Sequence, residues 1–122
     1  MAVLPGEKAM TIKSIVPTND PQIYKYGTEI DAEKYSKVRI KCRYGYSKNG
    51  EDEIMLFFST NKKPNYHRDR CVHIPLPSPD GEWHEFTADL KACPEWKDIV
   101  TSLRFDPFSD IGWMEIEYMY FE

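Results

Sequence analysis

The sequence predicts an all-β domain, an eight-stranded antiparallel β-sandwich of the jelly-roll type. Short segments of strand-like composition recur along the chain, clusters of turn-forming residues separate them, and no stretch has the periodicity of a long amphipathic helix. Aromatic residues make up 14% of the 122 residues, which suits β-structure. The expected strands are residues 9–15, 21–24, 37–44, 53–60, 71–75, 83–90, 99–106 and 113–121.

Alternation of apolar and polar residues supports several of these strands. In residues 37–44 every second residue is basic, and the residues between them are Val38, Ile40, Cys42 and Tyr44, so one face should be buried and one solvated. Residues 113–121 alternate as well, which places Met114, Ile116, Tyr118 and Tyr120 together on the inward face. Residues 54–58 are apolar throughout, which indicates a strand covered on both faces or one whose outer face meets a ligand.

The connections contain turn-forming residues, at 18–21, 48–50, 77–81 and 109–112. Residues 31–35 and 94–97 can each form a single helical turn. We therefore interpret residues 1–122 as one domain, without repeats or linkers.

A jelly-roll topology predicts which strands pair. One sheet should have the order 9–15, 113–121, 37–44, 83–90, and the other the order 21–24, 99–106, 53–60, 71–75. The basic side chains of 37–44 would then lie between Glu115 and Glu117 on one neighbour and Glu85 on the other. Opposite charges on adjacent strands are favourable, so the charge pattern supports this order.

Composition disfavours several classes of function. The net charge is −4 and the basic residues are scattered, whereas nucleic-acid binders usually carry a basic stripe. No apolar stretch approaches the roughly 18 residues of a membrane span. Residues 1–7 show no secretion signal, although a chain cut from a longer precursor would look the same.

Three cysteines, Cys42, Cys71 and Cys93, cannot all pair with one another. The odd count argues against a disulfide framework. We expect all three thiols to be free, with Cys42 buried on the inward face of its strand. Free thiols suit the cytosol or secretion into an anaerobic habitat.

Several short motifs, in order, resemble those of a recurring bacterial β-sandwich module. They are Asn-Asp-Pro-Gln-Ile at 19–23, Ile-Asp-Ala-Glu-Lys-Tyr at 30–35, Leu-Phe-Phe-Ser-Thr at 56–60, the run at 80–90, Pro-Glu-Trp at 94–96, Leu-Arg-Phe-Asp-Pro at 103–107 and Ile-Glu-Tyr at 116–118. Together they span about residues 8–122. The chain is thus similar to the non-catalytic carbohydrate-binding modules attached to plant-polysaccharide-degrading enzymes, cellulosomal proteins and surface-layer proteins.

This resemblance implies that the domain targets an attached enzyme to plant cell-wall polysaccharide, a β-glucan such as cellulose or a hemicellulose, and is not itself an enzyme. It implies secretion as part of a larger extracellular protein, in which catalytic or dockerin modules are covalently linked to this one. The implied partner is a polysaccharide or oligosaccharide, with no nucleic acid or membrane. No cofactor is expected, although a structural calcium ion is left open.

Sugar binding needs exposed aromatic rings for the apolar C–H faces of pyranose rings, and polar groups for their hydroxyls. The outer face of the second sheet and the long loop at 61–70 supply both kinds of residue. The candidates are Gln22, Tyr24, Phe57 (or Phe58, depending on register), Tyr66, His67, His73 and Arg104, with Trp113 at the sheet rim as a rival position. Taken singly, each of these is also compatible with a solvated or core residue.

Alternative interpretations remain at this stage. A glycosidase would need two carboxylates across a cleft, and Asp106, Asp110, Glu115 and Glu117 are the available acids. A zinc site would have to use Cys71, His73 and His67, which lack the usual second pair of closely spaced ligands. The runner-up to sugar binding is a structural or protein-interaction sandwich in a modular surface protein.

Overall fold

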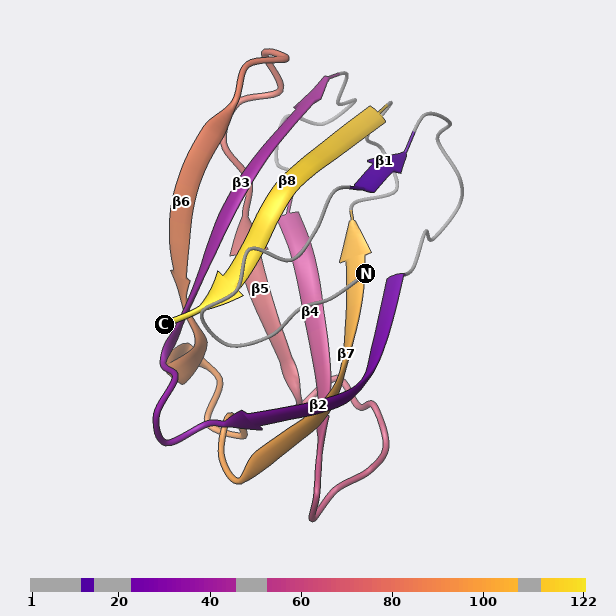
Figure 1. Cartoon of the computed structure of the whole chain (residues 1–122), viewed down its shortest axis with the longest axis vertical. Coiled ribbons are helices and arrows are strands. Elements are labelled where there is room, and N and C mark those ends of the chain that lie inside the picture. The colour runs from indigo at the N-terminus through magenta and orange to yellow at the C-terminus, as the bar shows by residue number, and fades with distance from the viewer. Residues whose placement is uncertain (1–11, 15–22, 46–52, 108–112) are drawn as a thin grey trace.

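The chain is all-β and consists of two antiparallel sheets, an arrangement compatible with a β-sandwich (Figure 1). The computed structural model describes residues 12–14, 23–45, 53–107 and 113–122. One sheet has the order β1 (Ile12–Ser14), β8 (Trp113–Phe121), β3 (Lys37–Gly45), β6 (His84–Asp89). The other has the order β2 (Ile23–Asp31), β7 (Ile99–Pro107), β4 (Glu53–Thr60), β5 (Cys71–Pro75).

The observed strand orders agree with the predicted pairings, and β3 lies between β8 and β6. Six strands, β3 to β8, cover most of their predicted ranges. Of the first predicted strand, 9–15, the described part is the three-residue β1, and its side chains lie outside the described residues. The prediction for the second strand was too short, because β2 continues from Ile23 to Asp31 rather than ending at Tyr24.

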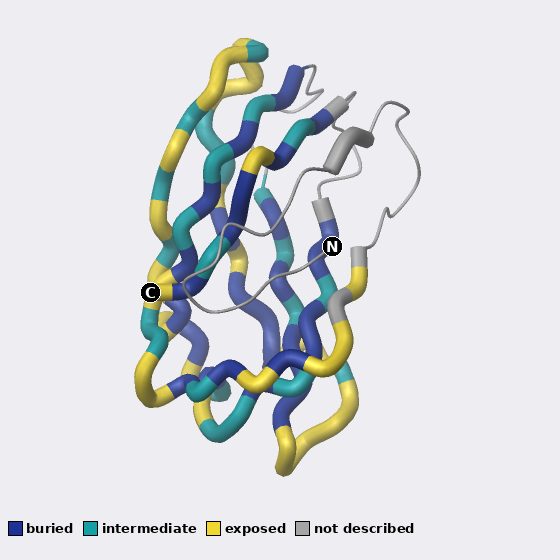
Figure 2. The backbone as a smooth tube through the Cα atoms, viewed as in Figure 1, coloured by how far each residue is buried: buried dark blue, intermediate teal, exposed yellow. Residues whose placement is uncertain are grey.

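The core lies between the sheets, as the burial pattern in Figure 2 shows. β3 alternates between buried and more exposed residues as predicted, with Val38, Ile40 and Cys42 fully buried. From the opposite sheet, Leu56 of β4 and Phe105 of β7 pack into the same core. All three cysteines are free thiols and Cys42 is buried, as expected; Cys71 and Cys93 are buried as well.

β8 departs from the predicted alternation. Lys41 pairs with Tyr118 and the next residue, Cys42, pairs with Ile116, so Glu117 is an extra residue in a bulge. Beyond the bulge Met119 and Phe121 face the core, whereas Tyr118 and Tyr120 were predicted to do so. Instead Tyr118 and Tyr120 stack on each other opposite Lys41 and Arg39.

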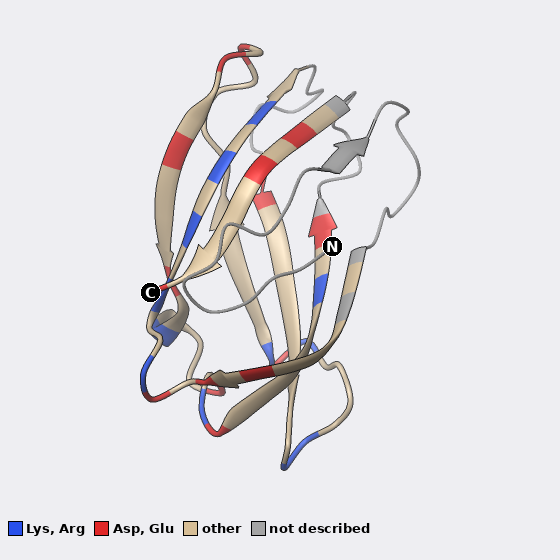
Figure 3. Cartoon of the chain, in the orientation of Figure 1, with Lys and Arg blue, Asp and Glu red and all other residues tan. Residues whose placement is uncertain are grey.

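The predicted charge ladder on this sheet is present (Figure 3). Arg39 of β3 pairs with Glu85 of β6 at 2.9 Å. Lys41 and Arg43 of β3 pair with Glu117 and Glu115 of β8, both at 3.0 Å. Solvent-exposed ion pairs contribute at most about 1 kcal/mol each, so the ladder adds little to the free energy of unfolding. Its main effect is to favour this order of the strands.

The segment between β6 and β7 closes one end of the core. It forms a short 3-10 helix, η1 (Leu90–Ala92), which was not predicted, and then a turn in which the N–H of Trp96 donates to the carbonyl of Cys93 at 3.0 Å, within the region where a single turn was considered. Trp96 is buried, packs against Phe58 and Phe121, and donates its indole N–H to the carbonyl of Tyr35 at 2.8 Å. Trp96 is therefore a core residue and is not available to a ligand.

Candidate functional site

The outer face of the second sheet carries a row of side chains that come from four different strands. Residues directly opposite each other in adjacent strands share a face. Tyr24 of β2 pairs with Arg104 of β7, Arg104 pairs with Phe57 of β4, and Phe57 pairs with Cys71 of β5. Leu103 and Phe105 point into the core, so Arg104 between them points outward. The register therefore brings three of the predicted site residues together: Tyr24, Phe57 and Arg104.

Two tyrosines on β2 form an exposed aromatic surface. The rings of Tyr24 and Tyr26 are nearly parallel, at 7°, with centroids 5.8 Å apart. The exposed fractions are 41% for Tyr24 and 66% for Tyr26, so both can be covered by a ligand. Together they form what we call the tyrosine platform. Apolar surface of this kind, presented with hydrogen-bonding groups around it, is typical of sites that bind amphipathic ligands.

The loop between β4 and β5 places Tyr66 beside the tyrosine platform. Its ring lies 6.1 Å from that of Tyr24, at an angle of 52°. Its hydroxyl donates to Oγ of Ser102 on β7 at 2.9 Å. Burial raises the pKa of Tyr66 above its ordinary value, so the phenol stays protonated at neutral pH. Loop residue Tyr66 is thus fixed to the sheet rather than projecting into solvent.

Arg104 is held rigidly at the centre of this face. Its Nε and Nη2 donate to the two carboxylate oxygens of Asp106, at 3.0 and 2.9 Å. Asp106 is only 2% exposed. The guanidinium lies over the ring of Phe57, 4.2 Å from its centroid, and 5.6 Å from the centroid of Tyr66. A bidentate pair and two aromatic contacts hold the guanidinium in one orientation on the outer face of the sheet.

The apolar run 54–58 is explained by this arrangement. Ile54, Leu56 and Phe58 are fully buried in the core, whereas Met55 and Phe57 lie on the outer face. The register thereby settles the choice between Phe57 and Phe58 in favour of Phe57. Arg104 covers one face of the Phe57 ring, so Phe57 supports the guanidinium instead of offering that face to a sugar.

The other predicted site residues are farther from the tyrosine platform or not described. His73 lies on the edge strand β5, opposite Met55, with Nδ1 2.9 Å from Oε1 of Glu53. His67 is an exposed loop residue whose Nδ1 accepts from the backbone N–H of Asp69. Gln22 lies outside the described residues. For Trp113 the backbone pairs with Gly45 at the start of β8, and its side chain lies outside the described residues.

Tyr26 is a member of the site that sequence reasoning missed, because the strand was predicted to end at Tyr24. The signal was present, since Tyr24 and Tyr26 are two residues apart and residues at that spacing in a strand share a face. Asp106 was named from the sequence only among the acids available for catalysis, and its pairing with Arg104 was not predicted.

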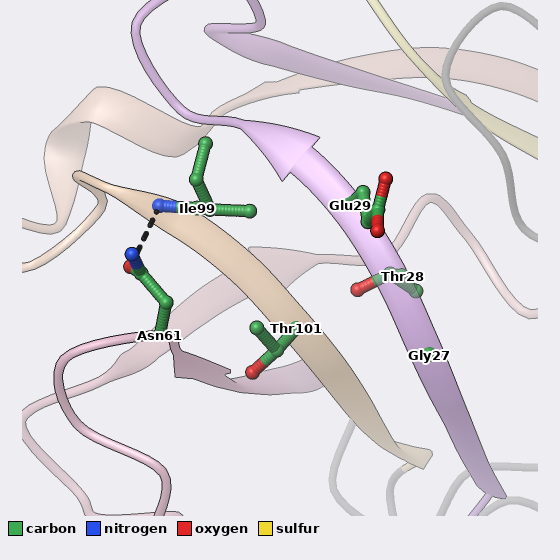
Figure 4. A pocket seen from close by; sticks show the side chains of 6 residues that line it. All are labelled: Gly27, Thr28, Glu29, Asn61, Ile99 and Thr101. Carbon is green, nitrogen blue, oxygen red and sulfur yellow. Dashed lines mark hydrogen bonds between the residues drawn. The ribbon is translucent and has the colours of Figure 1, made fainter.

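A cleft lies between β2 and β7 just beyond Tyr26 in the chain, and Figure 4 shows the residues that line it. The register of β2 and β7 shifts between Tyr26 and Ile30, so residues 27–29 bulge away from Thr101. Gly27 has a φ of 72°, a conformation that favours glycine. The cleft has a volume of about 650 Å³ and is lined by Gly27, Thr28, Glu29, Asn61, Ile99 and Thr101.

Among the described side chains beside the other sheet, the indole of Trp83 is 38% exposed. The guanidinium of Arg43 lies 4.5 Å from the Trp83 ring centroid and the ammonium of Lys41 lies 5.9 Å from it. Both cations are also members of the charge ladder. Because two ion-paired side chains cover this ring, the second sheet presents the more accessible aromatic surface.

The acids considered for catalysis do not converge. Asp106 pairs with Arg104 on the outer face of one sheet, whereas Glu115 and Glu117 pair with basic residues on the outer face of the other. Asp110 lies outside the described residues. Across the described part of the chain, no three His, Cys, Asp or Glu side chains are grouped so that they could hold a metal ion. Nor is any helix in that part long and apolar enough to cross a membrane.

The chain matches no protein-family model, and the search of curated proteins found no match.

Proposed function

We propose that the domain is a non-catalytic carbohydrate-binding module whose site is the tyrosine platform together with Arg104. The exposed, nearly parallel pair Tyr24 and Tyr26 is the observation that carries this proposal. A flat aromatic surface covers the C–H face of a pyranose ring, and the rigid Arg104 guanidinium beside it donates to ring hydroxyls. His73 and Gln22 are retained as flanking polar candidates.

The fold and the sequence motifs extend the proposal. The two strand orders support a jelly-roll assignment, which is the architecture of the carbohydrate-binding modules that the sequence resembles. In this proposal the module is part of a larger secreted protein, in which it tethers a linked catalytic or dockerin module to plant cell-wall β-glucan or hemicellulose. It binds the glycan without cleaving it.

The test is isothermal titration with mixed-linkage β-glucan, xylan and glucomannan, after affinity gel electrophoresis has ranked them. Truncating a central stacking residue costs at least about 2 kcal/mol, so Tyr24→Ala and Tyr26→Ala should each weaken binding roughly thirtyfold. Tyr120→Ala is the matched control, because Tyr120 is half-buried on the outer face of the opposite sheet.

Trp113→Ala tests the rival position at the sheet rim. If only Trp113→Ala abolishes binding, the tyrosine platform is not the site. If the parent protein binds none of the polysaccharides, the proposal fails and the structural or protein-interaction alternative replaces it.

A further inference from the structure

We propose that the cleft at residues 27–29 is a second sugar subsite, which takes the glycan residue next to the one stacked on Tyr26, and that the glycan is neutral. This inference rests on the proposed function of the tyrosine platform. The cleft and the platform are continuous, because Gly27 follows Tyr26 on β2 and Thr101 precedes Ser102 on β7, the residue that pairs with Tyr26. A chain lying along β2 from Tyr24 past Tyr26 therefore reaches the cleft.

The shape of the cleft comes from the backbone and does not require the ligand to form it. Gly27 in its left-handed conformation turns β2 away from β7, and the hydroxyl of Thr28 anchors the bulge by donating to the carbonyl of Val100 at 2.7 Å. On the other side, Asn61 is tied to β7 twice. Its backbone N–H donates to the carbonyl of Ile99 at 2.9 Å, and its Oδ1 accepts from the Ile99 N–H at 3.2 Å (Figure 4).

The lining groups match the hydroxyls of a sugar. The exposed carboxylate of Glu29 accepts hydrogen bonds, and with Oδ1 of Asn61 engaged, the amide Nδ2 is left as a donor. Thr101 adds a hydroxyl that lies 3.0 Å from Oγ of Ser59. Ile99 supplies an apolar wall. A mixture of an ionised acceptor, a donor, a hydroxyl and an apolar wall suits a polyhydroxylated ring with C–H faces.

The charges favour a neutral glycan over a uronate polymer. Of the six residues that line the cleft, Glu29 is the one that is charged, and its negative charge would repel the carboxylate of a uronic acid. Arg104 lies opposite Tyr24 of the tyrosine platform on the neighbouring strand. Its guanidinium already has the carboxylate of Asp106 as a bidentate partner. The described site therefore carries no uncompensated positive charge that would recruit a polyuronate.

The experiment uses isothermal titration of the whole chain with cello-, xylo- and galacturono-oligosaccharides of increasing length. A hydrogen bond to a charged group contributes about 1.5 kcal/mol or more, so Glu29→Ala should weaken the longer neutral oligosaccharides roughly tenfold. The shortest neutral oligosaccharide that still binds should be unaffected by Glu29→Ala and weakened by Tyr26→Ala. Glu33→Ala removes a nearby exposed carboxylate outside the cleft and should change nothing.

Glu29 is exposed, so its loss should leave the urea unfolding midpoint unchanged and the binding result interpretable. If Tyr26→Ala weakens binding but Glu29→Ala has no effect at any length, the second subsite is wrong and the tyrosine platform stands. An equal loss at every length would overturn the adjacent placement. Tighter binding of galacturono-oligosaccharides than of neutral ones would overturn the neutral ligand. If nothing binds, both proposals fall.

Discussion

Asp106→Ala should destabilise the domain by about 3 kcal/mol, because it leaves the guanidinium of Arg104 without its bidentate partner. The side chains of Asp106 and Arg104 are 3% and 21% exposed. Breaking a fully buried pair by removing one charge costs about 3–5 kcal/mol. One fifth of Arg104 can still be hydrated, so the lower end of that range applies. With a urea dependence of about 1.5 kcal/mol per molar for a small domain, the unfolding midpoint should fall by about 2 M.

The coupling between the two residues distinguishes this explanation from simple loss of packing. Arg104→Met alone leaves the carboxylate of Asp106 buried without its guanidinium partner, so it should cost about as much as Asp106→Ala. The double variant Arg104→Met/Asp106→Ala leaves neither charge behind, so it should cost less than either single change, and far less than their sum of about 6 kcal/mol.

Urea unfolding followed by tryptophan fluorescence measures all three variants. If the stability losses of the two single variants sum to the loss of the double variant within about 0.5 kcal/mol, the two residues act independently and the reasoning is refuted. Affinity should behave differently from stability. The double variant has lost the guanidinium donors, so it should bind polysaccharide no better than Arg104→Met.

Two further predictions concern the thiols and acid stability. Burial raises the pKa of Cys42 to about 12 and of Cys71 to about 11. A thiol reagent near neutral pH should therefore label neither residue in the folded protein, whereas the denatured protein should show three reactive thiols. Rapid labelling of Cys42 and Cys71 in the native protein would contradict this prediction. The pKa values of Asp80, Glu95 and Glu122 are lowered, chiefly by hydrogen bonds from the Glu82 N–H, Lys63 and Arg39 respectively. The contribution of these three carboxylates to the free energy of unfolding is present above the unfolded pKa of about 4 and is lost as the pH falls through their folded pKa values. The urea unfolding midpoint should therefore be lower near pH 3 than near pH 5. An equal or higher midpoint at pH 3 would argue against this prediction.

Strand order could be predicted from the sequence because two independent patterns agree. The alternation in 37–44 identifies a strand with one wet face, and the acids in 83–90 and 113–121 identify its neighbours. The observed ion pairs join those same residues. The bulge at Glu117 could not be predicted, because it depends on how β8 matches β3, and a continuous alternation in the sequence gives no sign of an extra residue.

The end of β2 was misjudged for a related reason. Residues 27–29, Gly-Thr-Glu, interrupt the apolar pattern and read as a break, since glycine weakens a strand interior. In the structure the strand continues through the interruption as an irregular, bulged segment and resumes pairing at Ile30. The same irregular segment forms one side of the cleft beside Tyr26.

Arg104 shows why the residues of a site can be predicted more easily than the contacts that hold their side chains in place. In the sequence Arg104 is compatible with two roles, pairing with a carboxylate and projection onto the outer face as a binding residue. The structure combines them, because residues 104 and 106 lie on the same face of β7 and the Asp106 carboxylate orients the guanidinium toward that face. Phe57, from the neighbouring strand, supports the guanidinium from below, and Tyr66 approaches it from the loop. Since the ion pair lies within β7, loss of Tyr66 should reduce ligand contact while leaving Arg104 in place, whereas loss of Asp106 should affect both the fold and the site.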